Sequence, residues 1–185
     1  MTDERQRVFN EGSTFYVLGE FDDDMRNGLV VPLTEKINEL ASQRDAVIDV
    51  WVSSTGGDAF LCMDLVQRFE LAKSRGIIVR TIVTSHAYSA GSMLAVTGTP
   101  GERYIASSAE HLIHYGTQWG YLVKSPREVE RNAQHQTRWF ETCVKHYERY
   151  AKVPKLRDHL RDDLFFVSAD DAIAWKLADK ELGEL

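Results

Sequence analysis

The chain has 185 residues, of which 43% are hydrophobic and 27% are charged, a composition typical of one globular domain. Its formal net charge of −6 argues against nucleic acid or an anionic membrane as a partner. A charged amino terminus and the lack of a long apolar run argue against a secretory signal and a membrane span. We therefore expect a cytoplasmic protein whose two cysteines, Cys62 and Cys143, are buried free thiols.

Apolar segments predicted to be strands alternate with amphipathic segments predicted to be helices along the first two thirds of the chain. The strands are expected at residues 14–18, 46–52, 77–84, 103–106 and 112–114. The helices are expected after the acidic run 22–24 and at residues 58–75 and 90–97. Pro32 is expected to interrupt the first of these helices. Strands that alternate with helices indicate βαβ units, so we predict an α/β fold with a mostly parallel sheet.

The last third of the chain has a different pattern. Ser125 is predicted to cap a long helix that starts at Pro126 and runs to about residue 152. Two apolar stripes run along the surface of this helix, and we expect a second subunit to cover part of them. Ser168 is expected to cap a last short helix at residues 172–177. Residues 1–13 are polar and predicted to be mobile, which leaves residues 14–185 as one domain.

Three predicted strand ends carry residues whose chemistry suits acyl transfer. Ser89 lies between a strand and a helix, where its hydroxyl would project beside the amides of the first helical turn. His114 ends the next strand, and Gly56 and Gly57 close an earlier one. Two glycines allow the backbone to approach a ligand closely, so their amides can face a developing oxyanion. Each residue alone also has a structural interpretation, as a helix cap, a core histidine or a turn.

A carboxylate is still needed to orient the histidine, and Asp162 and Asp163 are the candidates because they precede an apolar run. Adjacent residues in an extended segment point to opposite sides, so only one of the two can face His114. The remaining histidines show no metal-ligand spacing, and neither a metal nor a cofactor is expected.

Five blocks, in order along the chain, resemble the ClpP family, the proteolytic subunits of the ATP-dependent Clp protease. Residues 16–25 resemble the family's first strand and helix start, and residues 52–57 resemble its Asn-Ser-Pro-Gly-Gly turn, with Thr55 in place of proline. Residues 87–92 resemble Ala-Ala-Ser-Met-Gly-Ala, and residues 112–114 resemble Met-Ile-His. Near the end, residues 166–169 and 177–179 resemble Phe-Leu-Ser-Ala and Leu-Val-Asp.

This resemblance implies the crotonase-like (ClpP-like) ββα spiral fold, with a protruding handle region at residues 115–152. It implies that Ser89 is the nucleophile, that His114 is the general base, and that the amides of Gly57 and Ala90 hold the oxyanion. Asp163 lies at the family's interval from the histidine and is the implied acid. A homo-oligomer of stacked rings and a polypeptide substrate are also implied. The resemblance also allows a Clp-type ATPase as a partner, although residues 1–13 do not resemble the family's docking segment.

Three other interpretations are compatible with these residues. A phage-type head-maturation protease has a ClpP-like domain with the same triad. A catalytically silent ring subunit would have a structural role, and a triad with a displaced acid would be compatible with it. An acyl-CoA enzyme of the crotonase superfamily would use the amide pair to hold a thioester enolate, which leaves the serine and histidine unexplained.

Overall fold

One mixed sheet organises the protein, whose computed structural model describes residues 9–116, 125–161 and 164–185. Within those ranges the sheet has eight strands in the order β1-β2-β3-β4-β5-β8, and β6 and β7 branch from β4. The strands are β1 (Asn10–Glu11), β2 (Thr14–Phe21), β3 (Val47–Gly57), β4 (Ile78–Tyr88), β5 (Arg103–Ile105), β6 (Glu110–Ile113), β7 (Phe165–Ser168) and β8 (Lys180–Glu181). Only β1 with β2 and β6 with β7 pair antiparallel, which confirms the prediction of a mostly parallel sheet in a mixed α/β protein.

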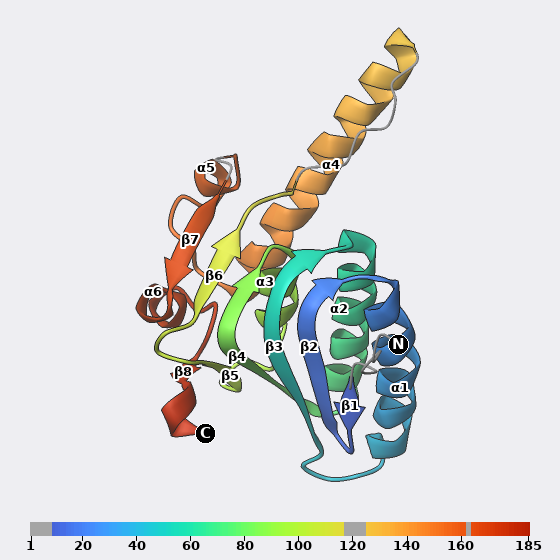
Figure 1. Cartoon of the computed structure of the whole chain (residues 1–185), viewed down its shortest axis with the longest axis vertical. Helices are drawn as coiled ribbons and strands as arrows, with labels where there is room; N and C mark the ends of the chain where they lie inside the picture. Colours follow the sequence, from blue (N-terminus) through green and yellow to red (C-terminus); the bar gives the residue numbers. More distant parts are fainter. Residues whose placement is uncertain (1–8, 117–124, 162–163) are drawn as a thin grey trace, which may run out of the picture.

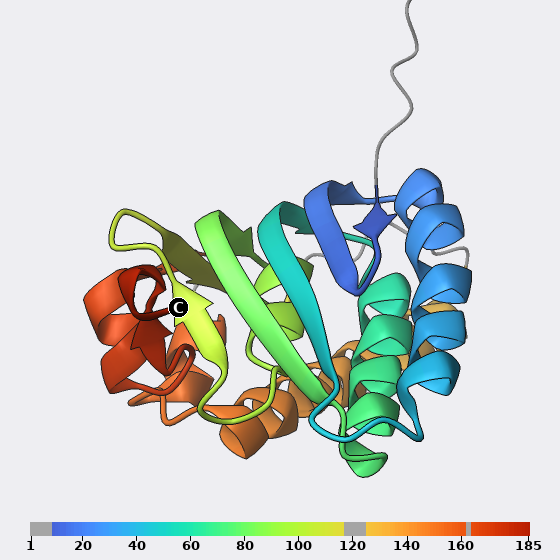
Figure 2. The ribbon, with the colours of Figure 1, turned by 90° about the horizontal axis from the view of Figure 1, so that it is seen from below.

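Helices lie at both ends of this sheet. They are α1 (Asp23–Leu40), α2 (Ala59–Ser74), α3 (Ala90–Ala95), α4 (Pro126–Tyr150), α5 (Leu156–Arg161), α6 (Ala169–Ala174) and a 3₁₀ turn, η1 (Leu182–Glu184). Figures 1 and 2 show α1 and α2 side by side near β2, whereas α5 and α6 lie at the other end beside β7. Ser168 caps α6 as predicted, but the helix starts at Ala169, directly after its cap.

Helix α1 does not break at proline, so the predicted interruption at Pro32 is wrong. The helix is continuous from Asp23 to Leu40, and Asp22 caps it by accepting a hydrogen bond from the amide of Met25. A proline inside a helix removes one backbone hydrogen bond. The predicted apolar face offsets this loss, because burial of each large side chain contributes about 1.5–3 kcal/mol. Its buried members are Met25, Leu29, Leu33, Ile37 and Leu40.

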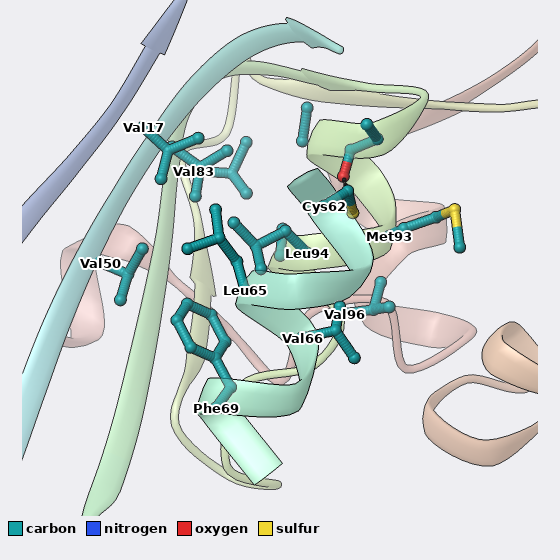
Figure 3. Packing of buried hydrophobic residues seen from close by; sticks show 14 of the residues in the cluster. Val17, Val50, Cys62, Leu65, Val66, Phe69, Val83, Met93, Leu94 and Val96 are labelled. Atoms are coloured by element: carbon teal, nitrogen blue, oxygen red, sulfur yellow. Dashed lines mark hydrogen bonds between the residues drawn. The ribbon is translucent and has the colours of Figure 1, made fainter. Parts of the chain in front are cut away.

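Helix α2 packs in the core through one apolar face, which buries Leu61, Cys62, Leu65, Val66, Phe69 and Ala72. Figure 3 shows Leu65, Val66 and Phe69 of this face among the buried residues of neighbouring elements. Phe60 and Leu71 on the same helix are 69% and 38% exposed. Asp58 caps the helix by accepting hydrogen bonds from the amides of Phe60 and Leu61. Cys62 on α2 and Cys143 on α4 are buried free thiols, as predicted.

Helix α4 projects away from the rest of the protein in Figure 1. Ser125 caps it through the amide of Glu128, as the sequence predicts. Only the carboxyl-terminal half is buried, and Val129 in the other half is 55% exposed. None of the helices in the described ranges has both the length and the apolarity that crossing a bilayer requires.

Arg103 joins three parts of the fold from a side chain that is only 4% exposed. Its Nε and Nη2 atoms donate to the two carboxylate oxygens of Asp179, each at 2.7 Å. Its Nη1 atom donates to the backbone carbonyls of Val96 and Tyr150. Burial acts to raise the pKa of Asp179, but the hydrogen bonds and charge of Arg103 outweigh it and lower that pKa below its ordinary value. The ends of α3 and α4 are thereby held to the strand β5 and the segment before β8.

We predict that Asp179→Asn lowers the free energy of unfolding by about 3–5 kcal/mol at pH 7, because it leaves the Arg103 charge buried without a counter-charge. The Asp179 pKa is depressed in the folded state, so its contribution is present above the ordinary pKa and is lost as pH falls through the folded pKa. Urea unfolding at pH 7 and pH 3 should therefore show a smaller difference at pH 3. Asp170→Asn, at an exposed carboxylate, is the control. A loss below about 1 kcal/mol at pH 7 would contradict the prediction.

Candidate functional site

Four of the five predicted site residues line one cavity of about 590 Å³. They are Gly57 at the end of β3, Ser89 and Ala90 at the junction of β4 and α3, and His114 directly after β6. The fifth, Asp163, and its alternative, Asp162, lie outside the described residues. Parallel pairing of β2, β3, β4 and β6 brings the four together, because their carboxyl-terminal ends meet at one edge of the sheet.

Ser89 has a backbone conformation that serine rarely adopts, with φ 55° and ψ −118°. Its amide donates to the carbonyl of Leu112 on β6 at 2.9 Å, and its carbonyl accepts from the amide of Met93 at 3.1 Å. These two bonds hold the turn in place. The Ser89 side chain makes no capping hydrogen bond to α3, so its interpretation as an ordinary helix cap is wrong. The hydroxyl is left available on a strained, well-fixed turn.

Gly56 permits the close approach of β3 to this turn. Its φ is 93°, and a Cβ atom built on it would lie 2.7 Å from the Cβ of Ser89 and 2.8 Å from the carbonyl oxygen of Tyr88. Gly57 has a φ of 133° and would place a Cβ 2.6 Å from the carbonyl oxygen of Phe21. The predicted strand end at residue 52 is wrong: β3 continues through both glycines because they pair with the end of β2.

Two residues that the sequence analysis did not single out support these glycines. Ser54 is fully buried, donates through Oγ to the carbonyl of Gly19 at 2.6 Å, and accepts from the amide of Gly56 at 3.1 Å. A Cβ on Gly91, in α3, would lie 3.1 Å from the Cβ of Ser54. The sequence signal for Ser54 is its place in the family-like block at residues 52–57, and that for Gly91 is its place in the block at residues 87–92.

His114 is half-buried, and its burial lowers the pKa of its ring below the ordinary value. The neutral form, which alone can accept a proton, therefore persists to lower pH than for an exposed histidine. The described residues include no hydrogen bond between the Ser89 hydroxyl and the His114 ring. Catalytic hydrogen bonds are often long in unliganded enzymes and tighten when substrate binds.

Helix α4 contacts the segment next to His114. The indole Nε1 of Trp139 donates to the carbonyl of Tyr115 at 2.7 Å, and the ring of Phe140 packs edge-on against the ring of Tyr115. Trp139 and Tyr115 also line the cavity. The long helix thus fixes the backbone beside the histidine, a contact that helical periodicity alone does not reveal.

A second serine–histidine pair lies beneath the first but has no access to the cavity. Ser92 Oγ and His111 Nδ1 are 3.0 Å apart, and both residues are fully buried. Burial, and secondarily the charge of Arg103, lowers the pKa of His111 to about 4. This buried pair does not line the cavity, whereas Ser89 and His114 both do. No cluster of three or more metal-ligating side chains occurs in the described part of the chain.

The Clp protease family model matches residues 2–183. The chain belongs to the Clp protease family. An ATP-dependent Clp protease proteolytic subunit of Deinococcus radiodurans is 26% identical over 140 residues, which cover 74% of this chain and 65% of that protein, just under two thirds of its length. Proteolytic subunit 2 of Bacillus licheniformis is 26% identical over 88% of this chain and 82% of its own length. Proteolytic subunit 3 of Streptomyces avermitilis is 33% identical over 58% of this chain and 48% of its own length.

For this Clp protease family member we predict that Gly56→Ala lowers the free energy of unfolding by about 3 kcal/mol, since it adds left-handed strain and a backbone clash beside Ser89. Gly76→Ala is the matched control. Gly76 also has a positive φ, 79°, but a Cβ there meets nothing within 4 Å. The free energy of unfolding of Gly76→Ala should fall by only about 1 kcal/mol, which is the cost of the backbone strain alone. Equal losses for the two variants in urea unfolding would show that the close approach has no energetic weight.

Proposed function

We propose that this Clp protease family member is a serine endopeptidase that uses Ser89 and His114. The observation that carries the proposal is the strained Ser89 turn, which leaves the hydroxyl uncapped in the same cavity as a half-buried, neutral histidine. The names of the relatives, proteolytic subunits of ATP-dependent Clp proteases, support a peptidase over other acyl-transfer enzymes.

In this mechanism the Ser89 hydroxyl attacks the scissile carbonyl while His114 takes its proton. The amides of Gly57 and Ala90 hold the oxyanion of the tetrahedral intermediate. His114 then protonates the leaving amine, and the acyl-enzyme forms. A water molecule, deprotonated by His114, hydrolyses the acyl-enzyme and restores the serine. We assign the orienting acid to Asp163, with Asp162 as the alternative.

We further propose that residues 14–185 form one ClpP-like ββα spiral domain, that residues 115–152 are its handle, and that copies assemble into stacked rings around the sites. Support comes from α4, where Val129 is a large apolar side chain that is 55% exposed and the buried residues all lie near the carboxyl-terminal end. The substrate would be an unfolded polypeptide or a peptide. A Clp-type ATPase is not assigned as a partner.

We predict that Ser89→Ala abolishes peptide hydrolysis, with a loss in turnover on the order of 10⁶, because the nucleophile is removed. A fluorogenic peptide measures the rate, and a fluorophosphonate probe should label the wild-type protein at Ser89. Ser92→Ala is the control, since that hydroxyl is buried, and it should still be labelled. If the Ser89→Ala variant were still labelled by the probe and still hydrolysed the peptide, the mechanism would be refuted. No labelling of the wild type would favour the silent subunit or the acyl-CoA enzyme, whereas a phage-type maturation protease would label equally.

The acid assignment has its own test. Asp163→Asn should lower turnover by about 10⁴, because an amide favours the wrong tautomer of His114, whereas Asp162→Asn should retain most activity. The same fluorogenic assay compares the two variants. The reverse order would transfer the role to Asp162, and full activity in both would place the third member elsewhere.

Assembly is tested at Val129, because Trp139 and Phe140 also contact their own chain. Val129→Glu should give smaller species in size-exclusion chromatography with light scattering, since a charge cannot be buried against a second copy without a partner. Gln134→Glu adds the same charge to the opposite side of the exposed half of α4 and should leave the size unchanged. An unchanged size in both variants would remove this helix from the interface.

A further inference from the structure

Among the described residues that line the cavity containing Ser89, one carboxylate has no cationic partner. This described lining has two carboxylates, Glu20 and Asp58, and no lysine or arginine. Asp58 is neutralised, because its Oδ2 atom lies 2.6 Å from Nη2 of Arg26 and its Oδ1 atom accepts from two amides of α2. Glu20 is exposed and forms no ion pair within the described chain. Glu20 therefore adds an uncompensated negative charge to the described lining.

This charge lies beside the proposed reaction centre. Glu20 pairs in register with Gly56, and its Cγ atom would be 2.9 Å from a Cβ built on Gly57, the proposed oxyanion donor. Burial lowers the pKa of His114, which favours the neutral ring over a cation that could offset the carboxylate. A cationic substrate group close to the scissile bond would meet an attractive field, and an acidic group a repulsive one.

The rest of the lining suits a long aliphatic stem. Phe60 is 69% exposed, although it is large and apolar, and it lines the cavity together with Met93, Tyr115 and Trp139. A lysine or arginine side chain can place its methylene groups on such a surface and keep its charged end beside a carboxylate. Aromatic faces add further attraction for a cation.

We propose that Glu20 makes the site selective for peptides that carry lysine or arginine next to the scissile bond. The inference rests on the peptidase function proposed above and deepens it by naming the substrate class. It comes from the carboxylate of Glu20 and the apolar lining together, because the carboxylate favours a cationic end group and the apolar lining favours the long stem that carries it.

The test is a set of fluorogenic peptides that differ at one position, with norleucine, lysine, arginine or glutamate placed in turn at each residue flanking the cleaved bond. Norleucine has a stem like that of lysine but no charge. At one flanking position or more, the lysine and arginine peptides should exceed the norleucine peptide in kcat/KM by about two- to fivefold, the range of a partly exposed ion pair. Glutamate should give the lowest value, and added salt should reduce the ratio.

In Glu20→Gln, the lysine-to-norleucine ratio should fall to about one, whereas the control Glu35→Gln, at an exposed position away from the cavity, should keep the wild-type ratio. A ratio of one in the wild type, or an unchanged ratio in Glu20→Gln, would overturn the inference. The same peptides, labelled for fluorescence anisotropy, are also titrated into Ser89→Ala. Tighter binding of the lysine peptide that depends on Glu20 would uphold the selectivity even if no peptide were cleaved, which would refute only the peptidase. Equal binding of the lysine and norleucine peptides would overturn the selectivity.

Discussion

The close contact between Gly56 on β3 and the Ser89 turn is the constraint on which the rest of the site depends. Two backbone segments meet there at a distance that excludes a single methyl group. Strand β3 can reach the turn because both glycines adopt positive φ angles, and Ser54 holds them from below. The contact places a strained serine, a helix start and a strand end around one opening, and no side chain intervenes.

Burial sets the charge state of the histidines around this opening. His111 and His146, which lie beneath α3, both have a pKa lowered to about 4, in each case mainly because burial disfavours the charged ring. Arg103 differs, because it cannot lose its proton and instead donates four hydrogen bonds, two of them to the carboxylate of Asp179. Neutral histidines thus lie beneath the site, and the unpaired carboxylate of its described lining is that of Glu20.

Sequence patterns predicted the elements with strong periodicity and missed those defined by long-range contacts. The apolar face of α1, the cap of α4 and the parallel strands follow from local spacing. The extension of β3 through Gly57 was missed because glycine lowers strand propensity, and only pairing with β2 keeps it in the sheet. Strands β1 and β8, two residues each, and α5 were missed because short segments carry little periodicity.

The site residues divide in the same way. Ser89, His114 and the glycines could be found because each stands at a predicted strand end, and the ordered blocks of the family resemblance reinforce that position. Glu20 and Trp139 could not be found, because their place at the cavity follows from the pairing of β2 with β3 and from the direction of α4. Asp58 was predicted to be the first residue of a helix, but only the fold reveals that it forms an ion pair with Arg26.

The pairing of β6 with β4 has a further consequence for how the protein can misfold. Only three residue pairs define that register, and the last of them is Tyr88 with Leu112. Ser89 follows Tyr88 directly, and His114 lies two residues after Leu112. A slip of β6 by one residue would move the histidine about 3.3 Å along the strand and turn its ring to the opposite face. Such a molecule would retain its helices, yet His114 would no longer face the cavity beside Ser89. Folding accuracy at this one short strand, rather than overall stability, would then determine what fraction of a refolded sample has both side chains at the cavity.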